Sequence, residues 1–354
     1  MTKAHLTVNG LMLIDAPHSA LNMLGLDPIE ENKVLVKSIQ RAGQQYPYVS
    51  AQALRYWWRQ ALETECGWQM SPIEREKKIA FTRAQPWQYP DDDVFGYMRA
   101  QKIEVADVDA KTGEQKLTKQ GEPKTRSENA TLTRVSPLKC SPLVSVTPQR
   151  LTRDFGTMSR HEGDPVPYER QFYASVLKGI FSLDITALGR FAQVNRTGFL
   201  NIDQKGLELA QEAGATVSEN EAVLDISERR KRAKDLISVL PHLVGGANQT
   251  LHLTDVTPKL VILTVLQGGN HLFMNVVKDE RGSAVIHTEA LREVLKAYKD
   301  RLKTDVFIGR RTGFMDDQAD ALSSLNGEGM PTVHVDELNT AISNFTEAMA
   351  KTIE

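Results

Sequence analysis

The chain opens with a short apolar segment of strand-like character. Leu6, Val8, Leu11 and Leu13 follow the near-alternation of apolar and polar positions that is typical of a β-strand. A second β-rich stretch, KVLVKSI, occupies residues 33–39. We expect these two segments to be strands that pair with each other.

A helix is predicted directly after Ser50. In the run AQALRYWWRQALETE, residues 51–65, apolar side chains recur at three- and four-residue spacing, which gathers them on one helical face. Ser50 stands just before the run, where a hydroxyl can cap the free amides of the first turn. The sequence therefore predicts an amphipathic helix from about residue 51.

Two long stretches are too polar to be core elements. Residues 102–134 carry Lys, Glu, Gly and Thr where a core element would carry leucine, and we interpret them as an exposed loop or hairpin arm. Residues 147–171, TPQRLTRDFGTMSRHEGDPVPYERQ, follow the apolar run 143–146 and are interpreted as a second protruding hairpin or loop.

Regular structure is predicted again in the second half. Residues 172–191 are apolar and β-capable, and residues 259–266 and 271–277 are predicted to form a hairpin around Gly268-Gly269-Asn270. Helices are predicted over residues 205–213, 226–240, 287–302 and 336–352. This order of elements suits an α+β domain of ferredoxin-like type with insertions.

Composition excludes several classes of protein. The 354 residues are 41% hydrophobic and 25% charged, close to the averages of soluble globular chains and far from fibrous or disordered ones. Cys66 and Cys140 are the two cysteines, which indicates neither a disulfide framework nor a cysteine zinc site. The longest apolar run, residues 260–266, is too short to cross a bilayer. We expect a soluble cytoplasmic protein without a membrane partner.

Motifs of common enzyme chemistry are missing from the sequence. None of the 23 glycines precedes a lysine, so there is no Walker A loop, and neither a G-x-G-x-x-G nor a G-x-S-x-G motif occurs. The carboxylate run Asp91-Asp92-Asp93 follows Pro90 and is interpreted as a solvated turn or a helix start. We expect no cofactor and no catalytic residues, and a metal site built from distant segments stays open.

The distribution of charge is more informative than its total. The formal net charge of −2 argues against a basic nucleic-acid-binding protein. Residues 313–354, however, hold eight acidic residues against one lysine, a local charge of −7, and the total of −2 leaves +5 for residues 1–312. The small total therefore hides an acidic end and a mildly basic body.

Arginines occur in two settings that suit an anionic ligand. Arg55 and Arg59 lie four residues apart on the predicted helix, where an anion along that face would relieve their mutual repulsion. The alternative is that they only flank a core formed by Trp57 and Trp58.

The second setting is the polar stretch 147–171. Its arginines are placed to meet phosphates or to stack on bases, whereas acidic neighbours leave a plain hydrated loop open as the alternative. These arginines are Arg150, Arg153, Arg160 and Arg170.

Several segments resemble one known family. They are YPYVSAQALRYWWRQAL (46–62), SALNMLG (19–25), KSIQR (37–41), Phe95-Gly96, and the glycine-rich LVGGANQ (243–249). The first contains Ser50, Arg55 and Arg59 in the spacing S-x-x-x-x-R-x-x-x-R. Together these segments resemble the DevR family of CRISPR-associated proteins, with the strongest likeness over about the first hundred residues.

The resemblance implies a fold and a role. It implies an RRM-like (ferredoxin-like) palm, a fingers insertion and a β-hairpin thumb, with many copies polymerising along a crRNA guide in a type I Cascade complex. The implied partners are the crRNA, target DNA paired to it, further copies of the chain and other Cascade subunits. The predicted boundaries are 1–101 and 172–312 for the palm, 102–142 for the fingers, 143–171 for the thumb and 313–354 for an acidic C-terminal segment.

A backbone subunit needs a grip that does not depend on base sequence, so phosphate contacts should dominate. The predicted RNA-binding residues are Arg41, Ser50, Arg55, Arg59, Arg150, Arg153, Arg160, Arg170, Gly245, Gly246 and Asn248. We expect the acidic C-terminal segment, which would repel RNA, to face a neighbouring subunit or solvent.

Two alternatives stay open at this stage. Backbone subunits of related type III complexes cut RNA with an aspartate in an early loop, and Asp15 here precedes Ala16-Pro17 with His18 nearby. An aspartate at such a position is also a common strand-ending turn residue. The third reading is a protein-interaction scaffold without RNA.

Overall fold

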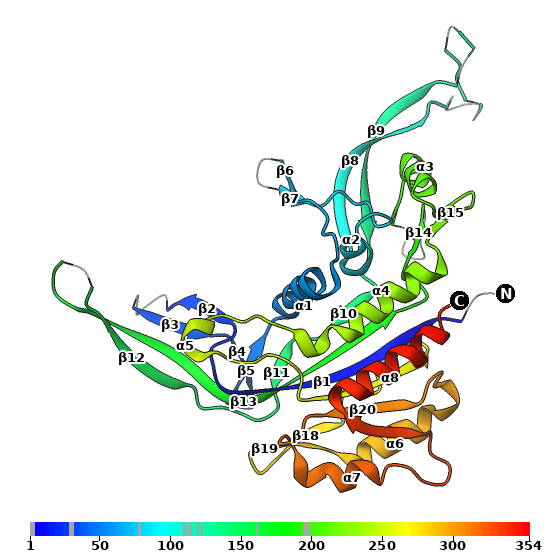
Figure 1. Ribbon diagram of the computed structural model, residues 1–354. Helices are drawn as coiled ribbons and strands as arrows, with labels where there is room; N and C mark the ends of the chain where they lie inside the picture. Colours follow the sequence, from blue (N-terminus) through cyan, green and yellow to red (C-terminus); the bar gives the residue numbers. More distant parts are fainter. Residues whose placement is uncertain are drawn as a thin grey trace. The chain divides into compact units, whose positions relative to one another are not determined.

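The computed structural model of the protein describes residues 4–354 except 28–31, 77–78, 109–111, 113–114, 119, 122, 161 and 194–198. The chain forms two compact units, each assembled from separate stretches of sequence (Figure 1). Unit 1 contains residues 1–67, 138–186 and 230–354, and unit 2 contains residues 68–137 and 187–229.

Unit 1 is organised around one large mixed sheet. Its main path runs in the order β21-β20-β17-β1-β13-β11-β5-β4. These strands are β1 (Leu6–Ser19), β4 (Ser38–Arg41), β5 (Gln44–Val49), β11 (Leu143–Ser145), β13 (Val166–Asp184), β17 (Leu260–Gln267), β20 (Val306–Arg310) and β21 (Val333–Glu337). β1 is central and antiparallel to both of its neighbours, with Leu11 opposite Ile180 of β13 and Ile262 of β17.

The predicted pairing of the first two strands is wrong. The stretch 33–39 divides into β3 (Lys33–Val36), which pairs with β2 (Met23–Leu26) and β13, and the start of β4. β1 instead pairs with the longer strands β13 and β17, because the backbone N–H and C=O groups of a buried strand need hydrogen-bond partners along both edges. β3, with four residues, is too short to satisfy an edge of this length.

Helices cover both faces of this sheet. On one face Trp58 of α1 (Ala51–Cys66) packs edge-on against Phe181 of β13 and donates its indole N–H to the Leu236 carbonyl of α4 (Ile226–Ser238). In the same unit, Phe345 of α8 (Leu338–Lys351) packs against Phe307 of β20. The other face buries Leu11 and Leu13 with residues of α6 (Thr288–Tyr298) and α7 (Ala319–Ser323).

The predicted helices and polar hairpins are confirmed. α1, α4, α6, α8 and α3 (Gln204–Glu212) fall within the predicted ranges, apart from small differences at their ends. β12 (Thr152–Met158) pairs with the first half of β13, from Met158 opposite Val166 to Thr152 opposite Phe172, and so forms the hairpin predicted over residues 147–171. β8 (Tyr97–Ala106) and β9 (Thr125–Arg134) form the predicted arm.

The predicted hairpin around Gly268-Gly269-Asn270 is wrong. β17 is followed by turns, and the next strand, β18 (Val277–Glu280), pairs with β19 (Ser283–Ile286). Both edges of β17 are occupied by β1 and β20. Leu272 instead donates its amide to the Asn9 side chain, which fixes residues after the turn to β1.

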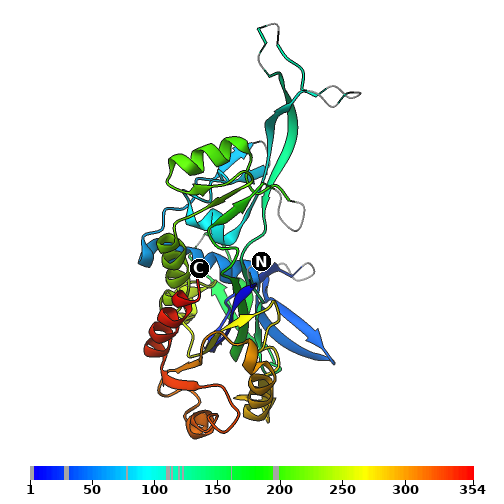
Figure 2. The same cartoon turned by 90° about the vertical axis from the view of Figure 1, so that its right-hand side faces the viewer.

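Unit 2 packs α3 on a small sheet and carries the β8–β9 arm beyond it (Figure 2). The small sheet has the order β14-β16-β15 and consists of β14 (Arg190–Ala192), β15 (Thr216–Val217) and β16 (Glu221–Val223). Unit 2 also contains α2 (Pro90–Phe95), β6 (Glu74–Glu76), β7 (Ile79–Phe81), β8 and β9.

The carboxylate run Asp91-Asp92-Asp93 begins α2 as a helix start, but it is not solvated. All three residues are buried, which corrects the prediction of a solvated segment. Asp91 accepts the Ser71 amide, Asp92 accepts the Gln85 amide, and Asp93 forms a buried ion pair with Arg134. Burial raises the pKa of Asp92. The run therefore ties the loops of unit 2 to α2.

The acidic C-terminal segment belongs to unit 1. β21 extends the sheet parallel to β20, and α8 buries Leu338, Ile342, Phe345 and Met349. Three of its carboxylates pair within the chain rather than only facing solvent or a neighbour. These ion pairs are Asp316 with Arg310, Glu337 with Arg311, and Glu347 with Lys234.

The architecture is thus mixed α+β, as predicted, whereas the finer division into palm, fingers and thumb stays a prediction. The remaining short elements are α5 (Gln249–His252) and three 3-10 turns at Leu240–His242, Lys299–Arg301 and Asp316–Gln318. Within the described residues, no helix is both long and apolar enough to cross a membrane.

Candidate nucleic-acid interface

The start of α1 is fixed by Ser50. Its hydroxyl oxygen accepts the amide of Ala53 at 3.3 Å while its own backbone remains extended. Because the hydroxyl satisfies a free amide of the first turn, Ser50 has a capping role whether or not RNA is bound. The helix ends at Gly67, whose left-handed backbone (φ 65°) lets its amide donate to Leu62.

Arg55 is turned toward the protein. Its guanidinium donates to the Leu138 carbonyl of β10 (Leu138–Cys140) and contacts the Cys140 thiol. Burial, together with the nearby Arg59 charge, lowers the pKa of Arg55, and burial raises the pKa of Cys140 to about 12. Arg55 therefore holds β10 against α1, and the mutual influence of the two arginines agrees with their predicted common face.

The glycine-rich segment packs tightly on α1 and on the end of β1. A Cβ atom on Gly245 would lie 2.3 Å from the Trp57 indole, and one on Gly246 would lie 2.4 Å from Leu21. Gly246 also has φ +100°, and Asn248 has φ 54°. Only glycine lets this backbone approach the indole so closely. We call residues 243–248 the glycine loop.

Backbone amides of the glycine loop are available to a ligand. Ala247 donates to the Leu21 carbonyl, and Gln249 braces the loop by donating to the carbonyls of Gly245 and Thr254. In the described part of the chain, the amides of Val244, Gly245 and Gly246 donate to no protein group. Consecutive unbonded amides of this kind can bind the oxygens of a phosphate.

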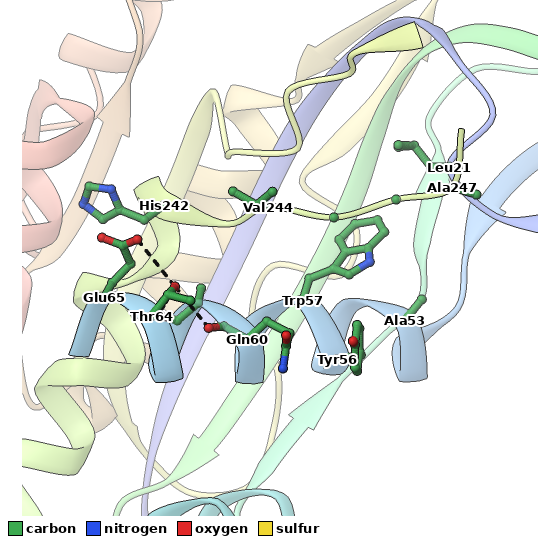
Figure 3. A pocket seen from close by; sticks show the side chains of 13 residues that line it. Leu21, Ala53, Tyr56, Trp57, Gln60, Thr64, Glu65, His242, Val244 and Ala247 are labelled. Carbon is green, nitrogen blue, oxygen red and sulfur yellow. Dashed lines mark hydrogen bonds between the residues drawn. The ribbon is translucent and has the colours of Figure 1, made fainter. Parts of the chain in front are cut away.

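A groove of about 660 Å³ runs between α1 and the glycine loop (Figure 3). Figure 3 shows Tyr56, Gln60 and Thr64 along α1, with Val244 and Ala247 on the facing segment. Tyr56 is 58% exposed, although it adjoins the buried Trp57. Exposed aromatic rings can stack on the bases of single-stranded nucleic acids, and backbone amides can bind their phosphates.

The arginines of the β12–β13 hairpin lie on its surface. Arg150, Arg153 and Arg160 are exposed, and Arg153 contacts Glu169, which also pairs with the buried Lys33. Arg170 lies over the ring of Tyr168 at 4.8 Å. The acidic neighbours therefore restrain Arg153, whereas Arg150 and Arg160 form no salt bridge in the described residues.

One face of this hairpin carries a pattern that the sequence analysis missed. Tyr168, Arg170 and Phe172 are two residues apart on β13, so their side chains share a face. Phe172 meets His252, just after the glycine loop, with ring centroids 5.7 Å apart. Burial lowers the pKa of His252. The two-residue spacing was the signal available in the sequence. The contact between Phe172 and His252 brings the hairpin next to the segment that follows the glycine loop.

Two further candidates remain. Arg41 is exposed at the end of β4, where it pairs with Gln44 of β5. Asp15 is not in a loop or a strand-ending turn, because it lies within β1 opposite Val176. Among the described residues, no group of His, Cys, Asp or Glu is arranged to hold a metal ion.

Comparisons with known proteins identify relatives of the fold and the family of the chain. One solved structure, titled "CRISPR RNA-guided surveillance complex", contains a chain of similar fold with a TM-score of 0.51 and 11% identity, over 97% of this chain and 99% of that one. A second, with "pre-nicking" in its title, has a TM-score of 0.52 and 12% identity over the same shares. No curated protein matches the sequence. The model of the family described as CRISPR-associated negative auto-regulator DevR/Csa2 matches residues 29–280, most of the chain, and the protein therefore belongs to this family.

Proposed function

We propose that this protein is a guide-RNA-binding backbone subunit of a type I CRISPR surveillance complex. Copies of it polymerise along the crRNA and hold its bases open for pairing with target DNA, together with other Cascade subunits. The protein has no catalytic part in this role. Base pairing, and not the protein, then reads the sequence of the target.

The main support for the proposal comes from the glycine loop. Its three unbonded amides, at residues 244–246, lie beside the groove that holds the exposed ring of Tyr56. Backbone amides and an aromatic face bind phosphate and base without preference for any base, which is what a repeated subunit on a guide of arbitrary sequence needs.

The hairpin arginines and the charge distribution support the same role. Arg150, Arg160 and Arg170 add cationic groups on or next to the β12–β13 hairpin, which contacts His252 through Phe172. A net charge of +5 over residues 1–312 is modest for an RNA-binding protein. Modest charge suits a subunit that holds a few nucleotides and gains strength by repetition along one strand.

Size-exclusion chromatography with absorbance at 260 and 280 nm tests the proposal. The wild-type chain, expressed with a CRISPR array, should elute as a large species with a high 260/280 ratio. Gly245→Ala should shift it toward an RNA-free species, because the added Cβ meets the Trp57 indole at 2.3 Å and displaces the loop amides.

Gly327→Ala is the matched control. Gly327 has ordinary backbone angles and no heavy atom within 4 Å of an added Cβ, so this variant should retain RNA. An RNA-free wild-type monomer would contradict the proposal. Equal RNA content in the two alanine variants, with both folded by circular dichroism, would remove the glycine loop from the RNA site.

A further inference from the structure

Four exposed cations follow one another in the chain, and one of them, Arg301, lies beside a turn whose Gly268 amide donates to the residue before β1. They are Lys296, Lys299, Arg301 and Lys303, which follow one another through the end of α6 and the next turn. In the described residues none of the four forms a salt bridge. Together with the turn Gly268-Gly269-Asn270 we call them the basic turn patch.

Arg301 lies against the turn itself. A Cβ atom on Gly268 would be 3.9 Å from both Cζ and Nη1 of Arg301, so the guanidinium stands beside the turn backbone. Gly268 has φ +136°, a conformation that favours glycine. On the next residue, a Cβ atom on Gly269 would be 3.6 Å from the imidazole of His5, which bonds to Asp184. Side chains from two distant segments thus flank the turn.

Two amides of the turn are open to a ligand. The Gly268 amide donates to the His5 carbonyl at 2.9 Å, whereas those of Gly269 and Asn270 have no partner in the described part of the chain, and both residues are exposed. Unbonded amides of exposed residues beside a guanidinium form the kind of site that binds phosphate oxygens.

Acidic side chains only partly offset these cations. Asp300 is exposed among them, and Asp305 bonds to His334. Four cations against Asp300 leave an excess of three positive charges over residues 296–303. Unpaired surface charges of one sign create a field that attracts a polyanion.

The basic turn patch is separate from the groove beside α1. Gly268 is bonded next to the first residue of β1, whereas Thr254, just after the glycine loop, bonds to Ser19 at its last residue. The 14 residues of β1 span roughly 45 Å at the usual rise of an extended strand. A phosphate at the patch therefore belongs to a different part of a strand, or to a different strand.

We propose that the basic turn patch binds the sugar–phosphate backbone of a single nucleic-acid strand without reading its bases. An acidic protein partner fits less well, because protein interfaces have an apolar core and are depleted in lysine. The apolar residues between these cations, Tyr298 and Leu302, pack inward on the core of unit 1. The patch therefore offers a partner charge and amides but little apolar surface.

The test uses the full chain and a fluorescein-labelled 20-mer of thymidine, followed by anisotropy at several salt concentrations. Lys299→Gln/Arg301→Gln/Lys303→Gln removes three cations of the patch. The control, Lys205→Gln/Arg281→Gln/Lys351→Gln, removes the same charge from exposed positions elsewhere. We expect the patch variant to bind about tenfold or more weakly at low salt, with the slope of log K against log salt reduced by about 2, while the control stays close to wild type.

Equal affinity and equal salt slope in the two triple variants would overturn the proposal. So would a patch variant that keeps oligonucleotide binding but loses self-association in sedimentation velocity, since the patch would then dock a second copy. If the triple variant does not fold, Arg301→Gln alone gives the decision, with an expected slope change of about 0.7. Both triple variants keep the glycine loop, so the outcome does not depend on the guide-RNA role.

Discussion

Removal of the Asp93 carboxylate should destabilise unit 2 strongly. Asp93 is 0% exposed, pairs with Arg134 and accepts the Gly189 amide on both oxygens, at 3.0 and 3.3 Å. Arg134 is itself buried, donates to the backbone carbonyls of residues 93, 187 and 190, and lies over Phe191 at 4.8 Å. In Asp93→Ala the guanidinium keeps these contacts but loses its counter-charge.

The expected size follows from burial. A buried ion pair that loses one partner costs about 3–5 kcal/mol, because a charge remains without compensation in the interior. A surface pair costs about 0–1 kcal/mol. Glu280→Ala, which breaks the exposed Lys278–Glu280 pair at 3.1 Å in unit 1, is therefore the matched control.

Hydrogen exchange with mass spectrometry separates the two units. In Asp93→Ala, amides of the small sheet in unit 2 should exchange roughly a hundredfold to several thousandfold faster than in wild type, since about 1.4 kcal/mol corresponds to tenfold. Amides of β17 in unit 1 should change much less. Asp93→Ala/Arg134→Met should recover part of the loss. A change below about 1 kcal/mol in unit 2 would refute the argument from burial.

Two further predictions concern the groove and the cysteines. Tyr56→Ala should weaken binding of guide RNA by about 1–3 kcal/mol, the usual value of one stacked base, as measured by filter binding. Met98→Ala, at an even more exposed position in unit 2, should not, and equal losses would exclude stacking on Tyr56. Burial raises the pKa of Cys66 to about 11 and of Cys140 to about 12, so iodoacetamide at pH 8 should alkylate the native protein far more slowly than the urea-unfolded chain. Since the unfolded thiols ionise near pH 9.0, their contribution to stability is complete below that pH and falls as the pH rises toward the native values. Rapid alkylation of the native thiols would contradict the raised pKa values of both cysteines.

Local patterns in the sequence predicted local structure well. The three- and four-residue spacing around Trp57 and Trp58 identified α1, and Ser50 marked its first turn. The polar stretches became the two hairpins, β8–β9 and β12–β13. These features depend on residues close together in the chain, where helical and strand periodicity and turn chemistry act directly.

Local sequence patterns did not predict the contacts between residues that are distant in the chain. The bond from the Leu272 amide to Asn9 spans 263 positions, and it replaced the hairpin that the glycines suggested. Asp93 looked solvated because Arg134, its partner, lies 41 positions later. Charged residues next to a turn look the same in a sequence whether they face water or a buried partner.

At the candidate site, too, local features could be predicted and long-range contacts could not. The glycines at 245 and 246 were singled out as RNA-binding residues, which stays a prediction, whereas the close approach of Gly245 to Trp57, almost 190 positions earlier, was not predicted. Arg55 was expected to point at phosphate, and its guanidinium instead reaches the Leu138 carbonyl. The side on which an arginine points depends on which strand lies beside its helix, and periodicity does not contain that information.

The central position of β1 sets the order in which the protein can form during synthesis. One neighbour, β13, ends at Asp184, but the other, β17, begins only at Leu260, and the glycine loop that closes on Trp57 comes just before it. A ribosome adding about 5–20 residues per second needs roughly ten seconds or more to pass from the first strand to the last of these segments. Until then the first strand has one open edge and the groove has one wall, so the groove does not yet exist in the nascent chain. Under the proposed function, RNA can therefore load at this groove only after the segment that ends at residue 248 has been synthesised.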